Sequence, residues 1–314
     1  MHTRNLDFAA ARALIARAID KAEDIGVRGA VAVVGASGAL ICASRMDHGG
    51  TGGMARARSK AWIAATQQIP SVVHLRRLGI IAPPMVAGFV ACSPEAVFPG
   101  AGGMPIADER GAVIAGIAAS GATVGPFVDY PGADRRKLIA DGRPANCEDL
   151  LVHYALAIPY EGQHGDDEQR WIDAYGALPD EPGLGMADPP PARAQPEHEW
   201  ALALADRAMA EAAAHGARVA VAVVDHRGDP IQQDCMDGAP TAGPFVAEAV
   251  AAGAATFQLP SEQLDPALAH VLPYRVACVA GGLPVREGER VVAGLGIGGV
   301  APELCGRIAA AALA

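Results

Sequence analysis

A glycine-rich segment near residue 50 carries the residue types best suited to chemistry. The segment Arg45-Met46-Asp47-His48-Gly49-Gly50-Thr51-Gly52-Gly53 leads into a helical pattern that carries Arg56, Arg58 and Lys60. Glycines let a ligand approach the backbone closely, and the N–H groups at a helix start attract anions. Arg56 and Lys60 are four residues apart and share one helix face. The pattern favours a site for a carboxylate or phosphate, and a glycine loop before a solvated basic helix face explains it equally well.

The candidate site extends to residues farther along the chain. The candidate catalytic groups are Asp47, His48 and Lys60, and the candidate substrate-binding residues are Arg45, Thr51, Arg56, His74, Gly102 and Gly103. The cations would hold an anion, Asp47 or His48 would move a proton, and the N–H groups of the glycine pair would stabilise an oxyanion. Asp47 and Thr51 equally suit a turn or a helix cap, and the glycine pair equally suits close backbone packing. His74 fits an acid/base group, an axial haem ligand or a solvated loop residue.

The chain repeats one module twice. Residues 25–47 align with residues 215–237 at an offset of 190, and the same offset aligns Pro70-Ser71 with Pro260-Ser261. Beyond an extra loop in the first copy, the glycine pair Gly102-Gly103 aligns with Gly281-Gly282. A repeat that preserves order and spacing over this length predicts two copies of one fold.

The cationic groups of the first copy do not recur in the second. Where the first copy has Arg45, His48, Arg58 and Lys60, the second has Cys235, Gly238, Glu248 and Val250. The aspartate and the threonine of the loop are kept, as Asp237 and Thr241. This contrast predicts a single divergent site on the first copy, with surface drift as the alternative.

The pattern within one copy predicts helix, hairpin, helix, strand, hairpin and helix. In the first copy these elements are residues 7–25, 30–34 with 39–44, 54–67, 86–92, 104–107 with 112–118, and 147–158. Asn5 or Asp7 is placed to cap the first helix, and Gly26 to end it. The order predicts an α+β fold in which each copy has a mostly antiparallel sheet with flanking helices.

A proline-rich tract separates the two copies. We expect a first module over residues 1–178, a linker over 179–196 that contains three consecutive prolines, and a second module over 197–314. An insertion at 122–145 and a further helix at 166–176 complete the first module.

Composition excludes several classes of function. A formal net charge of −10 and an aromatic content of 4% argue against nucleic-acid binding. No apolar run reaches the roughly 20 residues that span a bilayer, and the amphipathic N-terminus lacks a signal-peptide core, so we expect a cytoplasmic protein. The cysteines form no CxxC or Cys/His cluster, and no nucleotide or hydrolase motif is present, so neither a metal nor a nucleotide is expected. Gly294–Gly299 lies in a predicted hairpin strand, which excludes a dinucleotide loop.

Several motifs together resemble the GlcG/HbpS-like family, which includes the C-terminal domain of PduO-type proteins. They are the Gly-Val and Ala-Val-Val segments after the first helix, Arg45-Met46-Asp47, Lys60-Ala61 and the Gly-Gly-x-Pro hairpin, and they cover most of both copies. The resemblance implies a profilin-like sandwich that forms dimers or larger oligomers, and here an internal pseudo-dimer. It also implies an association with haem binding and degradation, with cobalamin-related proteins, or with the catabolism of small hydroxy acids and aromatics.

Two classes of function follow from the sequence. The first is a catabolic isomerase, tautomerase or hydrolase that acts on a carboxylate or other anionic substrate without a cofactor. The second is a protein that binds haem or another tetrapyrrole, with His48 or His74 near the iron. A non-catalytic assembly subunit is a third possibility.

Overall fold

The described residues fold into two compact units, each an α+β module. The computed structural model describes residues 6–93, 96–98, 100–122, 139–140, 143–163, 197–267 and 275–314. The first unit comprises residues 1–39 and 46–191, and the second comprises 40–45 and 192–314. The predicted linker at 179–196 and helix at 166–176 lie outside the described residues, as does most of the insertion at 122–145.

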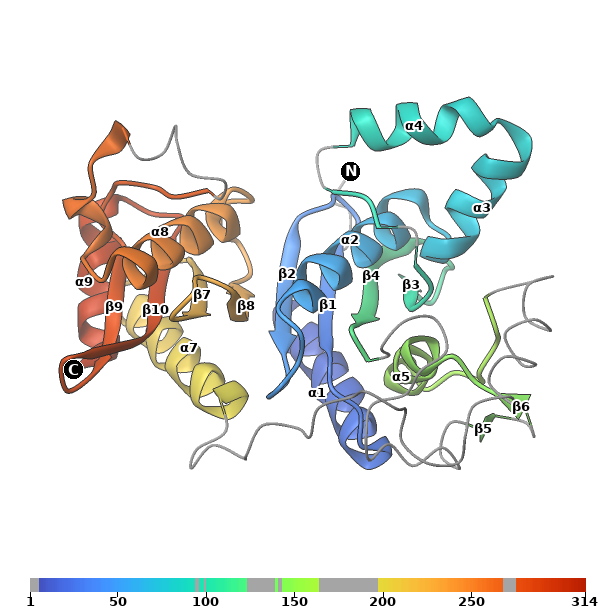
Figure 1. Cartoon of the computed structure of the whole chain (residues 1–314), viewed down its shortest axis with the longest axis horizontal. Coiled ribbons are helices and arrows are strands. Elements are labelled where there is room, and N and C mark those ends of the chain that lie inside the picture. The colour runs from blue at the N-terminus through green and yellow to red at the C-terminus, as the bar shows by residue number, and fades with distance from the viewer. Residues whose placement is uncertain are drawn as a thin grey trace, which may run out of the picture. The chain divides into compact units, whose positions relative to one another are not determined.

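The first unit is built on a short antiparallel sheet. Its elements are α1 (Phe8–Ile25), β1 (Ala30–Gly35), α2 (Gly52–Gln67), α3 (Ser71–Ile81), α4 (Pro83–Cys92), β3 (Gly103–Ala107), β4 (Val113–Ser120), β5 (Ile139–Ala140), β6 (Arg143–Pro144) and α5 (Cys147–Leu156). Strand β4 pairs antiparallel with β1 and with β3, and β5 pairs with β6 in a separate ladder. Helix α2 covers one face of the sheet, and α1 and α5 pack together on the other (Figure 1).

The second unit repeats this arrangement. Its elements are α7 (Glu197–Ala214), β7 (Ala220–Asp225), β8 (Pro230–Cys235), α8 (Gly243–Phe257), η3 (Ser261–Gln263), β9 (Gly282–Glu287), β10 (Arg290–Gly298) and α9 (Pro302–Leu313). Strand β2 (Leu40–Arg45) groups with this unit and pairs with β8, which gives the antiparallel order β2-β8-β7-β10-β9. The predicted α+β architecture with a tandem repeat is therefore confirmed.

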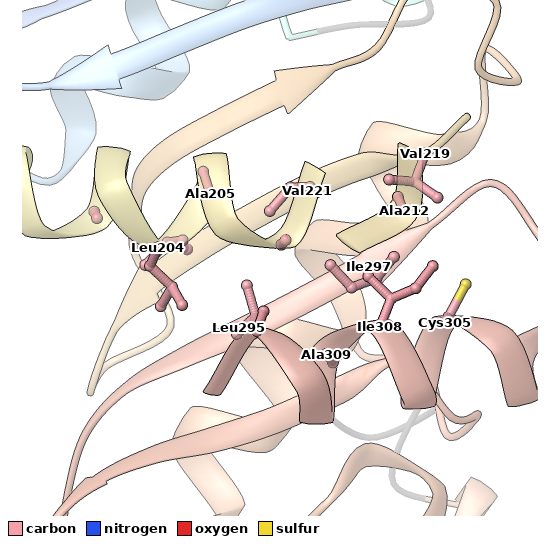
Figure 2. Packing of buried hydrophobic residues seen from close by; sticks show 14 of the residues in the cluster. Leu204, Ala205, Ala212, Val219, Val221, Leu295, Ile297, Cys305, Ile308 and Ala309 are labelled. Carbon is pink, nitrogen blue, oxygen red and sulfur yellow. The ribbon is translucent and has the colours of Figure 1, made fainter. Parts of the chain in front are cut away.

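Strand β7 shows how each sheet divides its side chains between two layers. Val221 and Val223 are buried in a cluster with residues of α7 and α9, whereas Ala222 and Val224 are buried against α8. Successive side chains of a strand point to opposite faces, so one apolar strand can serve both layers. Figure 2 shows Val221 in the first of these layers, with Leu295 and Ile297 of β10 and Ile308 of α9.

Glycines on β10 let helix α8 approach the sheet at backbone distance. A Cβ atom at Gly296 would collide with the carbonyl oxygen of Ala247, and one at Gly294 with that of Ala251. In the first unit, a Cβ atom at Gly116 of β4 would likewise collide with the carbonyl oxygen of Ala61 in α2. The glycine run at residues 294–298 is thus explained by close helix–sheet packing, as expected for a strand rather than a dinucleotide loop.

Most local signals in the first copy act as predicted. The Asp7 carboxylate accepts a hydrogen bond from the Ala10 N–H at 2.7 Å and caps α1, and Gly26 ends α1 at a φ of 87°. Gly38 takes a φ of 85° in the turn after β1. Thr51 differs from the prediction, because its side chain makes no capping hydrogen bond at the start of α2.

The predicted strand at residues 86–92 is wrong. These residues lie in α4, which begins with prolines at its first positions, and the matching residues 276–278 of the second copy have no regular secondary structure. A short apolar run suits a helix or a strand equally, and here alanine and the leading prolines favour the helix. The segment before it, expected as a loop, forms α3, so His74 lies on a helix.

We expect Gly296→Val to lower the free energy of unfolding of the full chain by more than about 2 kcal/mol, because the new side chain would force α8 away from β10. Denaturant unfolding measures this change. Gly50→Ala is the control, since a Cβ atom there meets nothing within 4 Å. Equal stability of the two variants would contradict the proposed backbone contact.

Candidate functional site

The Lys60 ammonium group lies in the interior of the first unit. Its side chain is 0% exposed. The Nζ atom forms an ion pair with Glu148 Oε2 at 2.5 Å and donates a hydrogen bond to the Ala101 carbonyl at 2.7 Å. A buried charge is tolerated only with such compensation. Lys60 therefore links α2 to the start of α5 and to the segment before β3.

Glu148 serves two groups at once. Its Oε1 atom accepts hydrogen bonds from the N–H groups of Gly121 at 2.7 Å and Ala122 at 3.3 Å, while Oε2 faces Lys60. The carboxylate stands in the first turn of α5, where the helix dipole favours a negative charge. The N–H groups that follow β4 therefore already donate to a carboxylate of the same unit, that of Glu148.

Asp149, the next residue of α5, is a fully buried carboxyl group. Its Oδ1 atom accepts a hydrogen bond from the Gly102 N–H at 2.5 Å, and Oδ2 has no hydrogen-bond partner within the described residues. Burial raises the pKa of Asp149 from 3.8 to about 7, and the Gly102 N–H and the Lys60 ammonium oppose that shift. Carboxyl groups with strongly shifted pKa values occur at functional sites and also in structural ion-pair networks.

The glycine pair is the meeting point of these groups. Gly102 has a φ of 92°, and a Cβ atom there would lie 3.2 Å from Lys60 Nζ. A Cβ atom at Gly103 would lie 2.7 Å from Ser71 Oγ, and that hydroxyl donates to the Gly100 carbonyl at 2.6 Å. Close packing accounts for both glycines, and the Gly102 N–H is engaged by an internal carboxylate.

Arg45 lies in the second unit, at the end of β2. Its guanidinium group forms an ion pair with Asp225 at 2.8 Å and donates a hydrogen bond to the Pro230 carbonyl at 2.9 Å. The side chain is 8% exposed. An external anion could use this group only by competing with Asp225.

The other loop candidates lie near the start of α2. His48 is exposed and has a φ of 61° in the turn in which the Gly49 N–H donates to the Met46 carbonyl. Asp47 is half-buried and Thr51 is exposed. The Arg56 guanidinium group lies 5.8 Å from the centroid of the Phe98 ring. The loop and the first turns of α2 therefore offer the exposed His48 imidazole and the Arg56 guanidinium group.

His74 lies on α3 beside the aromatic ring of Phe89. Its ring centroid is 4.8 Å from that of Phe89 in α4, and Phe89 in turn lies 6.3 Å from Trp62. The Nε2 atom is buried and has no hydrogen-bond partner in the described part of the chain. Burial lowers the pKa of His74, which favours the neutral imidazole at neutral pH.

The structure brings together only part of the predicted set. Lys60 and the glycine pair share one cluster, His74 stands apart on α3, and Arg45 belongs to the other unit. Sequence reasoning missed Glu148 and Asp149, which follow the N-cap Asn146, because nothing in their local pattern indicates a partner. Ser71 had a signal, since it recurs as Ser261.

The described residues contain no membrane or metal signature. None of the helices in this part of the chain is both long enough and apolar enough to cross a bilayer. The same residues contain no group of three or more His, Cys, Asp or Glu side chains placed to hold a metal ion.

A family model described as "Haem degrading protein HbpS-like" matches residues 6–125 and 197–314. The chain belongs to the HbpS-like family. The two matches fall on the two copies, which confirms the resemblance that the sequence motifs indicated. The HbpS-like chain has no match among curated proteins.

Solved structures similar to this HbpS-like chain each match a part of it. HbpS is 27% identical, with 41% of this chain and 96% of that chain covered and a TM-score of 0.36. A complex of PduOC with haem is 24% identical, with 38% and 94% covered and a TM-score of 0.36. A Streptomyces reticuli HbpS double mutant is 27% identical, with 43% and 97% covered and a TM-score of 0.37.

We expect Asp149→Asn to weaken the pH dependence of stability. The Asp149 pKa is about 7 in the fold and 3.8 as a free group, so its contribution is complete below about pH 4 and is lost as the pH rises through 7. The asparagine keeps the acceptor for Gly102 but cannot ionise. Urea unfolding between pH 5 and 8 measures the slope, which for one group reaches at most about 1.4 kcal/mol per pH unit.

Asp7→Asn is the control for this experiment, because Asp7 is an exposed helix cap that also accepts from a backbone N–H. It should leave the slope unchanged. An Asp149→Asn protein with the slope of the unmodified chain would show that Asp149 does not titrate in this range.

Proposed function

We propose that the first copy of this HbpS-like protein binds haem or a related tetrapyrrole, with His74 as the iron ligand. One observation carries the proposal: His74 Nε2 is buried, the imidazole lies beside the Phe89 ring, and Nε2 has no hydrogen-bond partner in the described residues. Iron coordination needs a neutral imidazole with an available lone pair. The lowered pKa of His74 supplies the neutral form. The family description and the haem complex of PduOC support this choice of ligand.

The helices around His74 suit the faces of a porphyrin. Ile80 and Ile81 at the end of α3 are 76% and 80% exposed, and Met85 and Val90 on α4 are 60% and 46% exposed. These side chains belong to two helices that contact each other, and contiguous exposed apolar patches mark binding sites. A flat apolar ligand would remove them from water, which favours binding at roughly 25 cal/mol per Å² of apolar area buried.

Access to His74 requires a movement of α4. The Phe89 ring lies against the imidazole, and no residue of α4 is buried. A helix with so little buried surface opens at small cost in free energy. Displacement of α4 from α3 would uncover Nε2 and leave the apolar side chains of both helices facing the ligand.

The basic residues after His74 suit the acidic edge of the same ligand. Arg77 is exposed, and Arg76 is half-buried with its guanidinium group donating to the Gln163 carbonyl at 3.0 Å. Arginine pairs well with carboxylates such as haem propionates. A bound haem would supply a redox-active iron, and these residues would orient it.

A cofactor-independent catabolic enzyme is the second candidate. Asp149 favours it, because a carboxyl group with a pKa of about 7 is matched to proton transfer at neutral pH. Two of the three cations expected to hold the substrate anion, Arg45 and Lys60, each form an ion pair with an internal carboxylate. A substrate anion would have to displace these carboxylates, and haem binding at His74 requires no such exchange. We therefore place haem binding first.

Titration of the full chain with haem tests the proposal. The unmodified protein should give a shifted Soret band that saturates at one haem per chain. His74→Ala should weaken binding by about 100-fold or more and change the visible spectrum, because the axial ligand is lost.

His48→Ala is the matched control, since His48 is an exposed histidine of the same unit. It should bind haem as the unmodified chain does. No Soret shift at stoichiometric haem would overturn the proposal, and so would a normal spectrum for His74→Ala.

A further inference from the structure

Three side chains hold three successive residues of the segment before β3. Ser71 Oγ donates to the Gly100 carbonyl at 2.6 Å, Lys60 Nζ donates to the Ala101 carbonyl at 2.7 Å, and Asp149 Oδ1 accepts from the Gly102 N–H at 2.5 Å. They come from α3, α2 and α5, respectively. We name residues 100–102 the held turn. Ser71 is the first residue of α3, one helical turn before His74.

The second copy keeps one of these three contacts. Ser261 Oγ donates to the Val279 carbonyl at 2.5 Å, as Ser71 does to Gly100. Val250 stands at the position of Lys60. The serine contact is therefore part of the shared fold, and the lysine contact belongs to the first copy alone.

The position of Asp149 in the second copy follows from the glycine pair. A Cβ atom at Gly102 would lie 2.7 Å from the Glu148 Cβ atom, and one at Gly281 would lie 3.0 Å from the Cys305 Cβ atom. Cys305 therefore takes the place of Glu148, and the next residue, Gly306, takes that of Asp149. At the positions of Lys60, Glu148 and Asp149, the second copy therefore has the uncharged residues Val250, Cys305 and Gly306.

The same copies differ at the residue proposed to bind iron. Leu264 lies 190 residues after His74, which is the offset of the repeat. It is 5% exposed and follows the short helix η3, whereas His74 lies on α3. The charged contacts on the held turn thus occur in the copy that carries α3 and its histidine. The second copy holds this turn with Ser261 alone, and the first copy adds a lysine and an aspartate to the serine in the copy that carries the histidine.

We infer that Lys60, Asp149 and Ser71 are positioning residues for His74, acting through the held turn. This inference rests on the proposed function. Lys60 and Asp149 fix the turn against α2 and α5, and Ser71 transmits its position to the start of α3. The rigid turn places the imidazole, while α4 remains the element that moves. None of the three residues is required to touch the ligand.

Paired serine variants test the inference in the full chain. Ser71→Ala should weaken haem affinity by about fivefold and shift the visible spectrum of the complex, since one hydrogen bond of about 1 kcal/mol no longer holds α3. Ser71→Thr should restore both. Ser261→Ala removes the equivalent bond from the second copy and also the bond that Ser261 Oγ accepts from the Gly282 N–H at 2.9 Å. It should leave haem affinity and spectrum unchanged although it costs at least as much stability.

The imidazole signals of the haem-free protein separate the two proposals. In ¹H–¹⁵N spectra, Ser71→Ala and Asp149→Asn should move the His74 resonances, and Ser261→Ala should not. Unchanged His74 resonances in Ser71→Ala would overturn the inference, whether or not haem binds. Moved resonances in a protein that fails to bind haem would refute haem binding and leave the positioning role supported.

Discussion

The Lys60 ammonium group places a full positive charge inside the first unit, and its neighbours are arranged to compensate that charge. Glu148 supplies the opposite charge, and the Ala101 carbonyl supplies a further acceptor. These contacts join α2, α5 and the segment before β3 at one point. Removing either partner of a buried ion pair leaves the other charge uncompensated at a cost of about 3–5 kcal/mol. The local geometry around the glycine pair therefore depends on the Lys60–Glu148 ion pair.

The second unit shows that the fold does not require these charges. Val250 and Cys305 stand where the first unit has Lys60 and Glu148, and the helix and strands there keep the same order and pairing. Apolar replacement of a buried ion pair is often neutral or stabilising. Stability alone therefore gives no reason to keep the charges in the first copy. A role in fixing the position of the held turn, residues 100–102, gives such a reason.

The sequence was sufficient for the architecture, because hydrophobic periodicity and turn residues act locally and occur twice. Asp7, Gly26 and Gly38 cap or turn the chain where their residue types predict. Helix α4 was missed because a short apolar run has no distinguishing period. The partners of Lys60 could not be predicted, since Glu148 lies 88 positions away and contacts at such separations leave no local pattern.

The two copies share the glycines that the close packing of a helix on the sheet requires. They differ in the segment that lies outside this contact. Gly116 and Gly296 both face backbone carbonyls of a helix, so neither position tolerates a side chain. Between that helix and the next strand, the first copy carries α3 and α4, and the described residues of the second copy, which omit 268–274, carry η3. Such a segment lies outside the close contact and can lengthen without disturbing it. The two copies of a tandem chain can therefore differ in this segment and in the charges beside it, so one copy can carry a ligand site while the other holds the apolar version of the same module.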